Sequence, residues 1–508
     1  MKKQLSLNLI TNLIAMVISL GINYLITPYV TKQLGIGAYS YVTIITNIIS
    51  FFTVITYTLN SMVGRFYTIA YNESEKKSNQ YISTAFFSCI ALAIILFPVI
   101  LFMTFNLDKI IIIDKELKKD VQFAFFISSM TFLLSTISSI MLTGTYAKNK
   151  LNINNTINII ANSLKGIVVF TLFYLFSAKI WFIGLGGLAQ ALLSIILGYI
   201  CFKHFIPTVK FRIKFFKKEY AKELILAGLF NSVILLGNNL MTQVDLIVGN
   251  RFIFDTELLG KYSVVLLFSN TIRQIASALS SAFSPTTIKL YAQKKYDELV
   301  KYTNKAVSIC STILGWPVSI IASLLVAFVF VWLKQDFTQY QYLFIIMLMS
   351  LLPNMAISQL NVLNQAMNKL KVPAIASIIA GFLNIILAII FVKVFEWGIY
   401  GIAIASIISL TLRNLIFAPI YASIITNQKC YIYYKPLLKS TGVSIITCIL
   451  GILIQKIYLV KSLRDIIIVA IILSIEYLGI TYCILNKNEK NELKGTINEI
   501  WKKKKLKN

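Results

Sequence analysis

Fourteen long apolar runs divide this 508-residue chain, and they constrain its fold more than any other feature. A helix of about 20 apolar residues crosses the hydrocarbon core of a bilayer. With 57% hydrophobic and only 13% charged residues, the chain cannot hide its apolar surface in one aqueous core. The sequence therefore predicts an all-α integral membrane protein with about 14 transmembrane helices, near residues 7–30, 38–60, 81–105, 121–143, 152–176, 180–202, 223–250, 258–283, 306–333, 341–363, 372–395, 398–424, 437–459 and 465–485.

The distribution of basic residues predicts the orientation of these helices. If the N-terminus lies in the cytoplasm, 32 of the 48 Lys and Arg residues fall in cytoplasmic segments, 13 in outer loops and 3 inside spans. This follows the positive-inside rule and places both termini in the cytoplasm. Topology and anionic membrane lipids explain the formal charge of +28, so no nucleic-acid partner is expected.

The chain also repeats itself at a nearly constant offset. Since the repeat unit holds six helices, its two copies share an orientation, and their pseudo-two-fold axis runs along the membrane normal. The prediction is an N-lobe at 1–215, a C-lobe at 216–424, and two further helices with a basic tail at 425–508. Glycines in the repeat are expected to let helices pack closely. The recurring motifs are Gly37-Ala-Tyr39-Ser40 with Gly260-Lys-Tyr262-Ser263, Leu20-Gly21 with Leu236-Gly237, Asn149-Lys150-Leu151 with Asn368-Lys369-Leu370, and Gly184-x-x-Gly187 with Gly398-x-x-Gly401.

Three bases lie near the middle of predicted spans, namely Lys165, Arg273 and Arg413. Each costs about 2.5–3.5 kcal/mol at a helix centre, so they should face a wet cavity or pair with acids. Glu476 is the one acid at a comparable depth. A positive surplus at mid-membrane suits an anionic ligand, and the three bases are predicted to converge on a central substrate cavity.

The helix near 152–176 carries a polar face. Asn155, Asn158, Asn162 and Lys165 are spaced 3, 4 and 3 residues apart, which places them on one side of the helix. Such a stripe lines either a polar cavity or a helix–helix seam, since Asn side chains bridge membrane helices. The cavity is favoured because a seam gives Lys165 no obvious counter-ion. Arg65, at the cytoplasmic end of the second span, is either a headgroup anchor or a substrate-binding base.

Nothing in the sequence predicts catalytic residues, a metal centre or a cofactor. His204 is the only histidine, and the six cysteines form no C-x-x-C pair. A membrane polysaccharide polymerase, ligase or lipid-sugar glycosyltransferase would need a large outer loop, or acids in the first one. The first outer loop, 31–37, has no acid, so an enzyme is disfavoured.

Two lobes plus two helices, with L-G-x-G-x-Y-S at 34–40 and Asp245 followed by Gly260-x-Tyr262-Ser263, resemble the bacterial polysaccharide-unit flippases. These belong to the superfamily of the multidrug and toxin extruders and the lipid II flippases. The resemblance covers about residues 5–485. It implies a transporter in the bacterial inner membrane that turns undecaprenyl-diphosphate-linked oligosaccharides from the inner to the outer leaflet, as in capsule or O-antigen export. It also implies cationic residues lining the cavity, which Lys165, Arg273 and Arg413 would supply.

The expected partners are the polyprenyl-diphosphate-linked oligosaccharide and membrane lipids, together with a coupling ion, H⁺ or Na⁺, and a polysaccharide polymerase. A flippase for lipid II or another polyprenyl-linked glycan remains an alternative. A multidrug extruder of the same fold is weaker, since it needs acids in its cavities. A major facilitator is weaker too, because the segment from Arg65 lacks the G-x-x-x-D-R-x-G-R-R motif.

Overall fold

The computed structural model describes residues 2–458 and 460–484, and almost all of them lie in helices. No strand occurs in this described part of the chain, which confirms the all-α prediction. The predicted basic tail, with its lysines from position 487 onward, lies outside the described residues.

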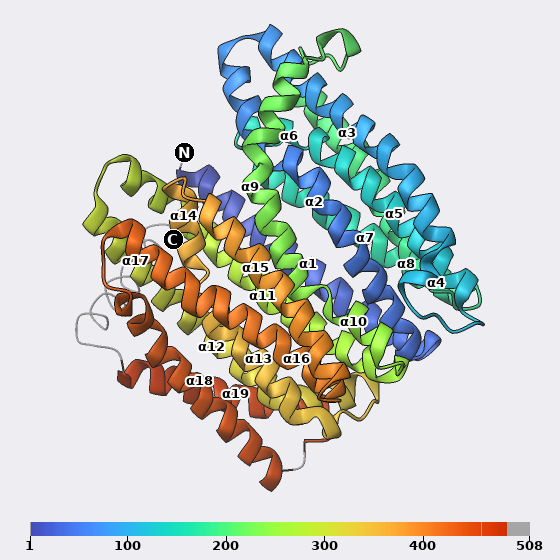
Figure 1. The fold of residues 1–508 in the computed structure, drawn as a ribbon, viewed down its shortest axis with the longest axis vertical. Helices are drawn as coiled ribbons and strands as arrows, with labels where there is room; N and C mark the ends of the chain where they lie inside the picture. The colour runs from blue at the N-terminus through green and yellow to red at the C-terminus, as the bar shows by residue number, and fades with distance from the viewer. Residues whose placement is uncertain (1, 459, 485–508) are drawn as a thin grey trace, which may run out of the picture. The chain divides into compact units, whose positions relative to one another are not determined.

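Figure 1 shows the helices in chain order, coloured by residue number. Their internal contacts divide them into two compact units. The first combines the chain up to Leu267 with Asn368–Arg413, and it holds α1 (Lys2–Leu34), α2 (Ile36–Glu73), α3 (Glu75–Phe105), α4 (Leu107–Ile110), α5 (Lys118–Met141), α6 (Thr143–Ala147), α7 (Leu151–Leu175), α8 (Trp181–Phe205), the 3-10 turn η1 (Ile213–Phe215), α9 (Lys218–Thr242), α10 (Asp245–Phe252), α15 (Lys371–Lys393) and α16 (Gly398–Thr411). The second combines Phe268–Met367 with the chain from Asn414, and it holds η2 (Thr338–Tyr340), α12 (Tyr296–Leu333), α13 (Gln341–Ala356), α14 (Gln359–Ala366), α17 (Ala418–Thr426), α18 (Tyr431–Ile457) and α19 (Leu463–Ile484). The boundaries of the units fall inside two helices, α11 (Thr256–Ala292) and the π-helical segment η3 (Leu412–Phe417), so each unit holds part of both.

Thirteen of the fourteen predicted spans are long and apolar enough to cross a membrane, among the residues described. The exception is the run near 258–283. It lies in α11, which has 37 residues and would be about 55 Å long. Lys261 and Arg273, with the polar residues around them, lower its hydropathy below that of the other spans. Length alone would let α11 cross the bilayer, but its composition distinguishes it from the rest.

The two copies of the repeated Gly-x-Tyr-Ser motif pack against each other inside the first unit. A Cβ atom placed on Gly260 would lie 2.1 Å from the carbonyl oxygen of Ile36. A Cβ on Gly37 would lie 3.2 Å from the Thr256 hydroxyl. The starts of α2 and α11 therefore contact each other closely. The lobe boundaries at 215 and 424, and the axis itself, stay predictions.

Small residues also bring α9 against its neighbours, as expected for membrane helices. A Cβ on Gly228 would lie 1.9 Å from the carbonyl oxygen of Thr58 on α2. A Cβ on Gly237 would lie 2.4 Å from the backbone of Ser377 on α15. These distances show that α9 lies in close contact with α2 and with α15. Because the neighbouring atoms are backbone and cannot rotate away, a larger side chain would not fit. The predicted packing role of Gly237 is confirmed.

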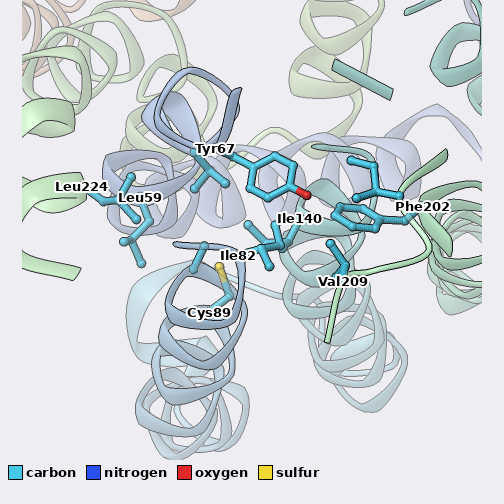
Figure 2. Close-up of a cluster of buried hydrophobic side chains, with 11 residues drawn as sticks. Leu59, Tyr67, Ile82, Cys89, Ile140, Phe202, Val209 and Leu224 are labelled. Carbon is cyan, nitrogen blue, oxygen red and sulfur yellow. The ribbon is translucent and has the colours of Figure 1, made fainter. Parts of the chain in front are cut away.

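An apolar core holds together one end of α2, α3, α5 and α8 (Figure 2). It contains Tyr67 and Cys89, both fully buried, and Phe202 near the end of α8. The connector after α8 adds Ile206 and Val209 to the same cluster. Burial of these side chains folds the connector back onto the helix bundle instead of leaving it as a free loop.

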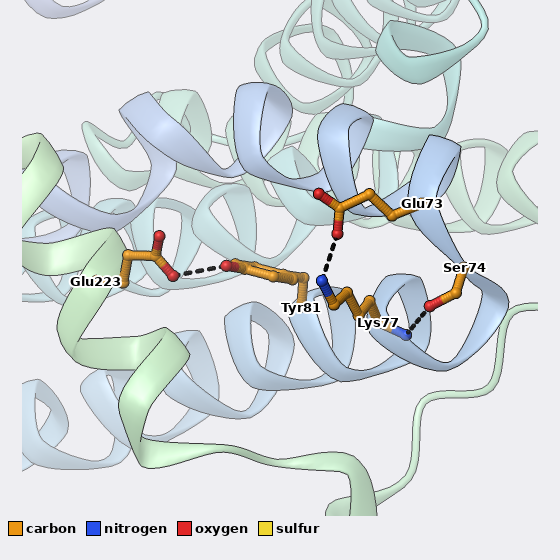
Figure 3. A network of polar contacts seen from close by, with 5 residues as sticks. All are labelled: Glu73, Ser74, Lys77, Tyr81 and Glu223. Atoms are coloured by element: carbon orange, nitrogen blue, oxygen red, sulfur yellow. Dashed lines mark hydrogen bonds and ion pairs between the residues drawn. The ribbon is translucent and has the colours of Figure 1, made fainter.

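Polar contacts tie the α2–α3 turn to α9 (Figure 3). Ser74 caps α3 by accepting from the Lys77 amide at 3.2 Å, and the Tyr81 hydroxyl donates to Glu223 on α9 at 2.6 Å. The Glu73–Lys77 ion pair, at 2.6 Å, is about half exposed at both ends and adds little stability. The cap and the tyrosine contact therefore fix this corner.

The loop between α3 and α5 is fixed to the bundle at its other end. Asn250 on α10 donates to the Ile112 carbonyl at 2.9 Å and accepts from the Ile112 amide at 2.7 Å, so its amide pairs with the loop backbone as another strand would. The Asp114 amide donates to the Tyr41 hydroxyl at 3.1 Å. A hydrogen bond from Lys118 lowers the pKa of the exposed Asp108 carboxyl.

In the second unit, α12 packs against α13, α18 and α19. The Ser311 hydroxyl lies 3.1 Å from that of Ser440, which joins α12 to α18. Glu476, the acid expected at mid-depth, accepts from Thr447 at 2.7 Å, so this contact joins α18 to α19.

Candidate functional site

Lys165 lies near the middle of α7 and is partly exposed. Its stem packs on α8, where a Cβ on Gly186 would lie 3.3 Å from the Lys165 Cγ. No carboxylate oxygen of the described chain lies within ion-pair distance of its ammonium group. Lys165 therefore lies on the polar face of α7 without a carboxylate partner among the described residues.

The other predicted bases have different surroundings. Arg413 lies in the π-helical segment, is only 4% exposed, and donates from Nε to the Ser377 hydroxyl at 3.2 Å. Arg273 lies on the part of α11 that belongs to the second unit and is partly buried. Arg65 is exposed on α2. The predicted convergence of Lys165, Arg273 and Arg413 involves residues of both units and stays a prediction.

The asparagine stripe of α7 contributes to two helix–helix seams. Asn155 donates to the Asn8 carbonyl at 3.2 Å and to the Thr11 hydroxyl at 3.1 Å, both on α1. Asn162 accepts from Gln190 on α8 at 3.2 Å. Asn158 lies between them and is exposed. The seam interpretation explains the contacts of Asn155 and Asn162, and substrate contact by any of the three asparagines stays a prediction.

Replacing Asn155 with alanine should therefore lower stability. Interhelical hydrogen bonds in membranes contribute about 0.6 kcal/mol on average and up to about 1.7 kcal/mol, and Asn155 makes two. We expect a fall of a few degrees in the melting temperature of the purified protein, measured by intrinsic fluorescence. Asn158→Ala is the matched control and should melt like the parent. Equal melting of the two variants would contradict the seam role.

A second polar cluster surrounds Asp245, which is only 3% exposed. Its carboxylate accepts from the Tyr262 hydroxyl at 3.0 Å and from the Asn384 amide at 3.4 Å, and it lies 2.7 and 2.8 Å from the Ser406 hydroxyl. These groups come from α10, α11, α15 and α16, all within the first unit.

The Ser406 hydroxyl lies at the centre of this cluster. It lies within 3.4 Å of four acceptor oxygens: both of Asp245, the amide oxygen of Asn384 at 3.3 Å and the carbonyl of Met241 at 3.4 Å. One hydroxyl carries one proton, so it can satisfy one of them well. Tyr262, Asn384 and Ser406 thus surround the Asp245 carboxylate with polar groups from three other helices.

Backbone groups of the first unit also contact this cluster. The span Lys218–Phe252 is interrupted after Thr242, where α9 ends, and resumes at Asp245, where α10 begins. The carbonyls of Leu240 and Met241, in the last turn of α9, accept from Asn384 and Ser406. Interrupted membrane helices commonly present such carbonyls to Na⁺ or H⁺ sites.

Sequence reasoning noted Asp245 but did not select it as a site residue. Two signals pointed to it. It is an acid inside an apolar run, and the repeat aligns Asn384 with Lys165. One copy of the repeat therefore carries a base, and the other carries an amide that contacts a buried acid. No group of three His, Cys, Asp or Glu residues that could hold a metal occurs in the described part of the chain.

Comparison with known proteins decides the family. The family model described as "Polysaccharide biosynthesis protein" matches residues 5–291, more than half of the chain. The chain belongs to this family. It is also 29% identical over 489 residues to the uncharacterized membrane protein EpsK of Bacillus subtilis, covering 96% of this chain and 97% of that one. The resemblance stated from the sequence is confirmed at the level of family.

Solved structures show the fold of this polysaccharide biosynthesis family member. The lipid II flippase MurJ in an inward closed conformation matches with a TM-score of 0.67 and 16% identity, covering 93% of this chain and 98% of that one. An inward-facing multidrug resistance transporter of the MATE family, in the MOP superfamily, matches with a TM-score of 0.62 and 13% identity, covering 81% and 94%. The chain is a multi-pass membrane protein with the fold of these transporters.

Proposed function

We propose that this protein flips a polyprenyl-diphosphate-linked oligosaccharide from the inner to the outer leaflet of the bacterial inner membrane, for surface polysaccharide export. Lys165 carries the proposal, because its ammonium has no carboxylate partner among the described residues. A diphosphate headgroup would supply the missing negative charge. The polysaccharide biosynthesis family supports a glycan cargo, and lipid II flippase MurJ shares the fold.

In this proposal Lys165, Arg273 and Arg413 hold the diphosphate, while Arg65 and the asparagines Asn155, Asn158 and Asn162 contact the cargo along its path. Both termini lie in the cytoplasm. Moving two negative charges outward across a potential of 100 mV that is negative inside releases about 4–5 kcal/mol. The bases need only lower the barrier, because they do not cross with the cargo.

The same proposal includes a coupling ion, Na⁺ or H⁺, bound at Asp245. The crowding of acceptor oxygens around Ser406 and the interrupted helix at Thr242 support it. A polysaccharide polymerase that receives the flipped cargo, and the surrounding membrane lipids, are its further partners. An ion that binds in one state of the transporter and not the other would bias the lobes toward that state.

Lys165→Ala tests the cargo site. A hydrogen bond to a charged group contributes about 1.5–3 kcal/mol, so its loss should slow flipping of a fluorescent undecaprenyl-diphosphate oligosaccharide in proteoliposomes by roughly tenfold to a hundredfold. Lys165→Arg is the matched control, since it keeps the charge, and should retain most of the rate.

Parental flipping rates in the folded Lys165→Ala protein would refute this site. Export of organic cations without any lipid flipping would refute the function and favour a multidrug extruder. If lipid II is flipped and the oligosaccharide carrier is not, the cargo assignment fails while the flippase remains.

A further inference from the structure

A cavity of about 520 Å³ lies beside α3, α5 and α8, where the connector after α8 folds back. One wall is apolar and includes Phe86, Ile137 and Ile195. The other carries the bases Lys203, Lys210 and Arg212. All of these residues belong to the first unit. The cavity takes no part in the proposed cargo or ion site.

Buried side chains of α3 fix the connector that supplies two of these bases. Asn79 accepts from the Lys210 amide at 2.7 Å, and the Ser83 hydroxyl donates to the Lys210 carbonyl at 3.0 Å. The Arg212 amide lies 3.4 Å from the same hydroxyl. Asn79 and Ser83 are at least 96% buried. The backbone under both bases is therefore held in place, and the site is formed before any ligand arrives.

Aromatic packing holds the connector at the same point. The ring of Phe211, between the two bases, lies 5.0 Å from that of Phe86 on α3 and 5.6 Å from that of Phe202 on α8, measured between centroids. Phe211 also lines the cavity. Apolar and basic side chains therefore line the cavity together, and a ligand that enters must satisfy both.

The three bases have no carboxylate partner within the described ranges. Lys203 donates to the Val209 carbonyl at 2.9 Å, which still leaves it two N–H donors. Next to the cavity, Ile196, Tyr199 and Ile200 form an exposed apolar face of α8, each at least 45% accessible. A ligand that matches both the basic side chains and the exposed apolar face must carry an anionic group and an apolar chain. A membrane phospholipid has both, and a small soluble anion does not.

We propose that this cavity binds the headgroup of an anionic phospholipid, with its acyl chain lying along the exposed face of α8. Lys203, Lys210 and Arg212 hold the phosphate, and Phe86 and Phe211 contact the glycerol and upper acyl carbons. Basic pockets between membrane helices on the cytoplasmic side bind such headgroups. The proposal rests on the membrane fold and on no particular cargo.

Native mass spectrometry of the full-length protein in detergent tests this site, with dioleoyl phosphatidylglycerol as the probe and dioleoyl phosphatidylcholine as the comparison. The parent should bind phosphatidylglycerol preferentially. The triple variant Lys203→Gln, Lys210→Gln, Arg212→Gln should bind it about tenfold to a hundredfold more weakly, because each base near a lipid surface contributes several-fold. Inorganic phosphate should not displace the lipid.

The matched control is Lys217→Gln, Lys218→Gln, Lys222→Gln, which removes the same charge from exposed positions that do not line the cavity. It should bind phosphatidylglycerol like the parent. If the first triple does not fold, Arg212→Gln alone should still weaken binding. Equal binding of the two phospholipids, equal loss in both triples, or displacement by inorganic phosphate would overturn the proposal. Lipid binding is measured without cargo, so its result tests the lipid site independently of the proposed flipping function.

Discussion

Replacing Asp245 with asparagine is expected to abolish the ion dependence of transport. Asp245 supplies the only negative charge among the described contacts of its cluster, and its carboxylate lies 2.7–3.0 Å from Ser406 and Tyr262. Removing a buried charge from a close contact costs about 2 kcal/mol or more, which is at least roughly thirtyfold in cation affinity. The measurement is flipping in proteoliposomes under an imposed Na⁺ or H⁺ gradient.

A binding readout makes this test independent of the cargo. If Na⁺ is the ion, NaCl should raise the melting temperature of the parent above its value in equal KCl, and Asp245→Asn should remove the difference. Asp297→Asn, an exposed acid on α12, should behave like the parent. An Asp245→Asn protein that keeps its gradient dependence would show that the coupling ion binds elsewhere or not at all.

Gly260→Ala should be the most destabilising single methyl addition in the repeated motif. The new Cβ would lie 2.1 Å from the Ile36 carbonyl oxygen, and backbone cannot rotate away as a side chain can. Overpacking of this kind typically costs about 1–3 kcal/mol and occasionally more, and here the starts of α2 and α11 must separate. We expect most of the protein to be lost to aggregation during expression, measured by fluorescence-detected size-exclusion chromatography.

The repeat supplies the control. At Gly37 the added Cβ would meet the Thr256 hydroxyl at 3.2 Å, and a side-chain oxygen can move by a few tenths of an ångström. Gly37→Ala should therefore give a monodisperse protein with a slightly lower melting temperature. Gly21→Ala, where nothing lies within 4 Å, should be neutral or slightly stabilising. A Gly260→Ala protein as stable as Gly37→Ala would contradict the close contact.

The spans could be predicted from sequence because crossing a membrane depends on local length and hydropathy. α11 departs from the pattern because Lys261 and Arg273 lower its hydropathy, although the helix is long enough to cross. The spacing of the asparagines predicts that they share one side of α7, but it does not predict which helices pack against that side. Asn155 meets α1 and Asn162 meets α8, and this depends on packing that no spacing encodes.

The Asp245 cluster was harder to predict for a related reason. Asn384 and Ser406 are 139 and 161 residues away along the chain, so no local motif joins them to the acid. In the sequence, the connector between α8 and α9 is recognisable only as a basic segment. Its position beside the cavity depends on Asn79 and Ser83, ordinary polar residues that lie far away along the chain. Sequence periodicity predicts which residues share one side of a helix, whereas the contacts of that side depend on residues far away along the chain.

The π-helical segment Leu412–Phe417 carries a consequence for how this chain is compared with its relatives. Such a segment accommodates one extra residue within a helix, and each residue of an α-helix turns the chain by about 100°. A relative with a regular helix here should align with a one-residue gap between α16 and α17. An ungapped alignment would assign the wrong partner to every residue on one side of Arg413. A single inserted codon can thus reorient half of a membrane helix while leaving the length of the span almost unchanged.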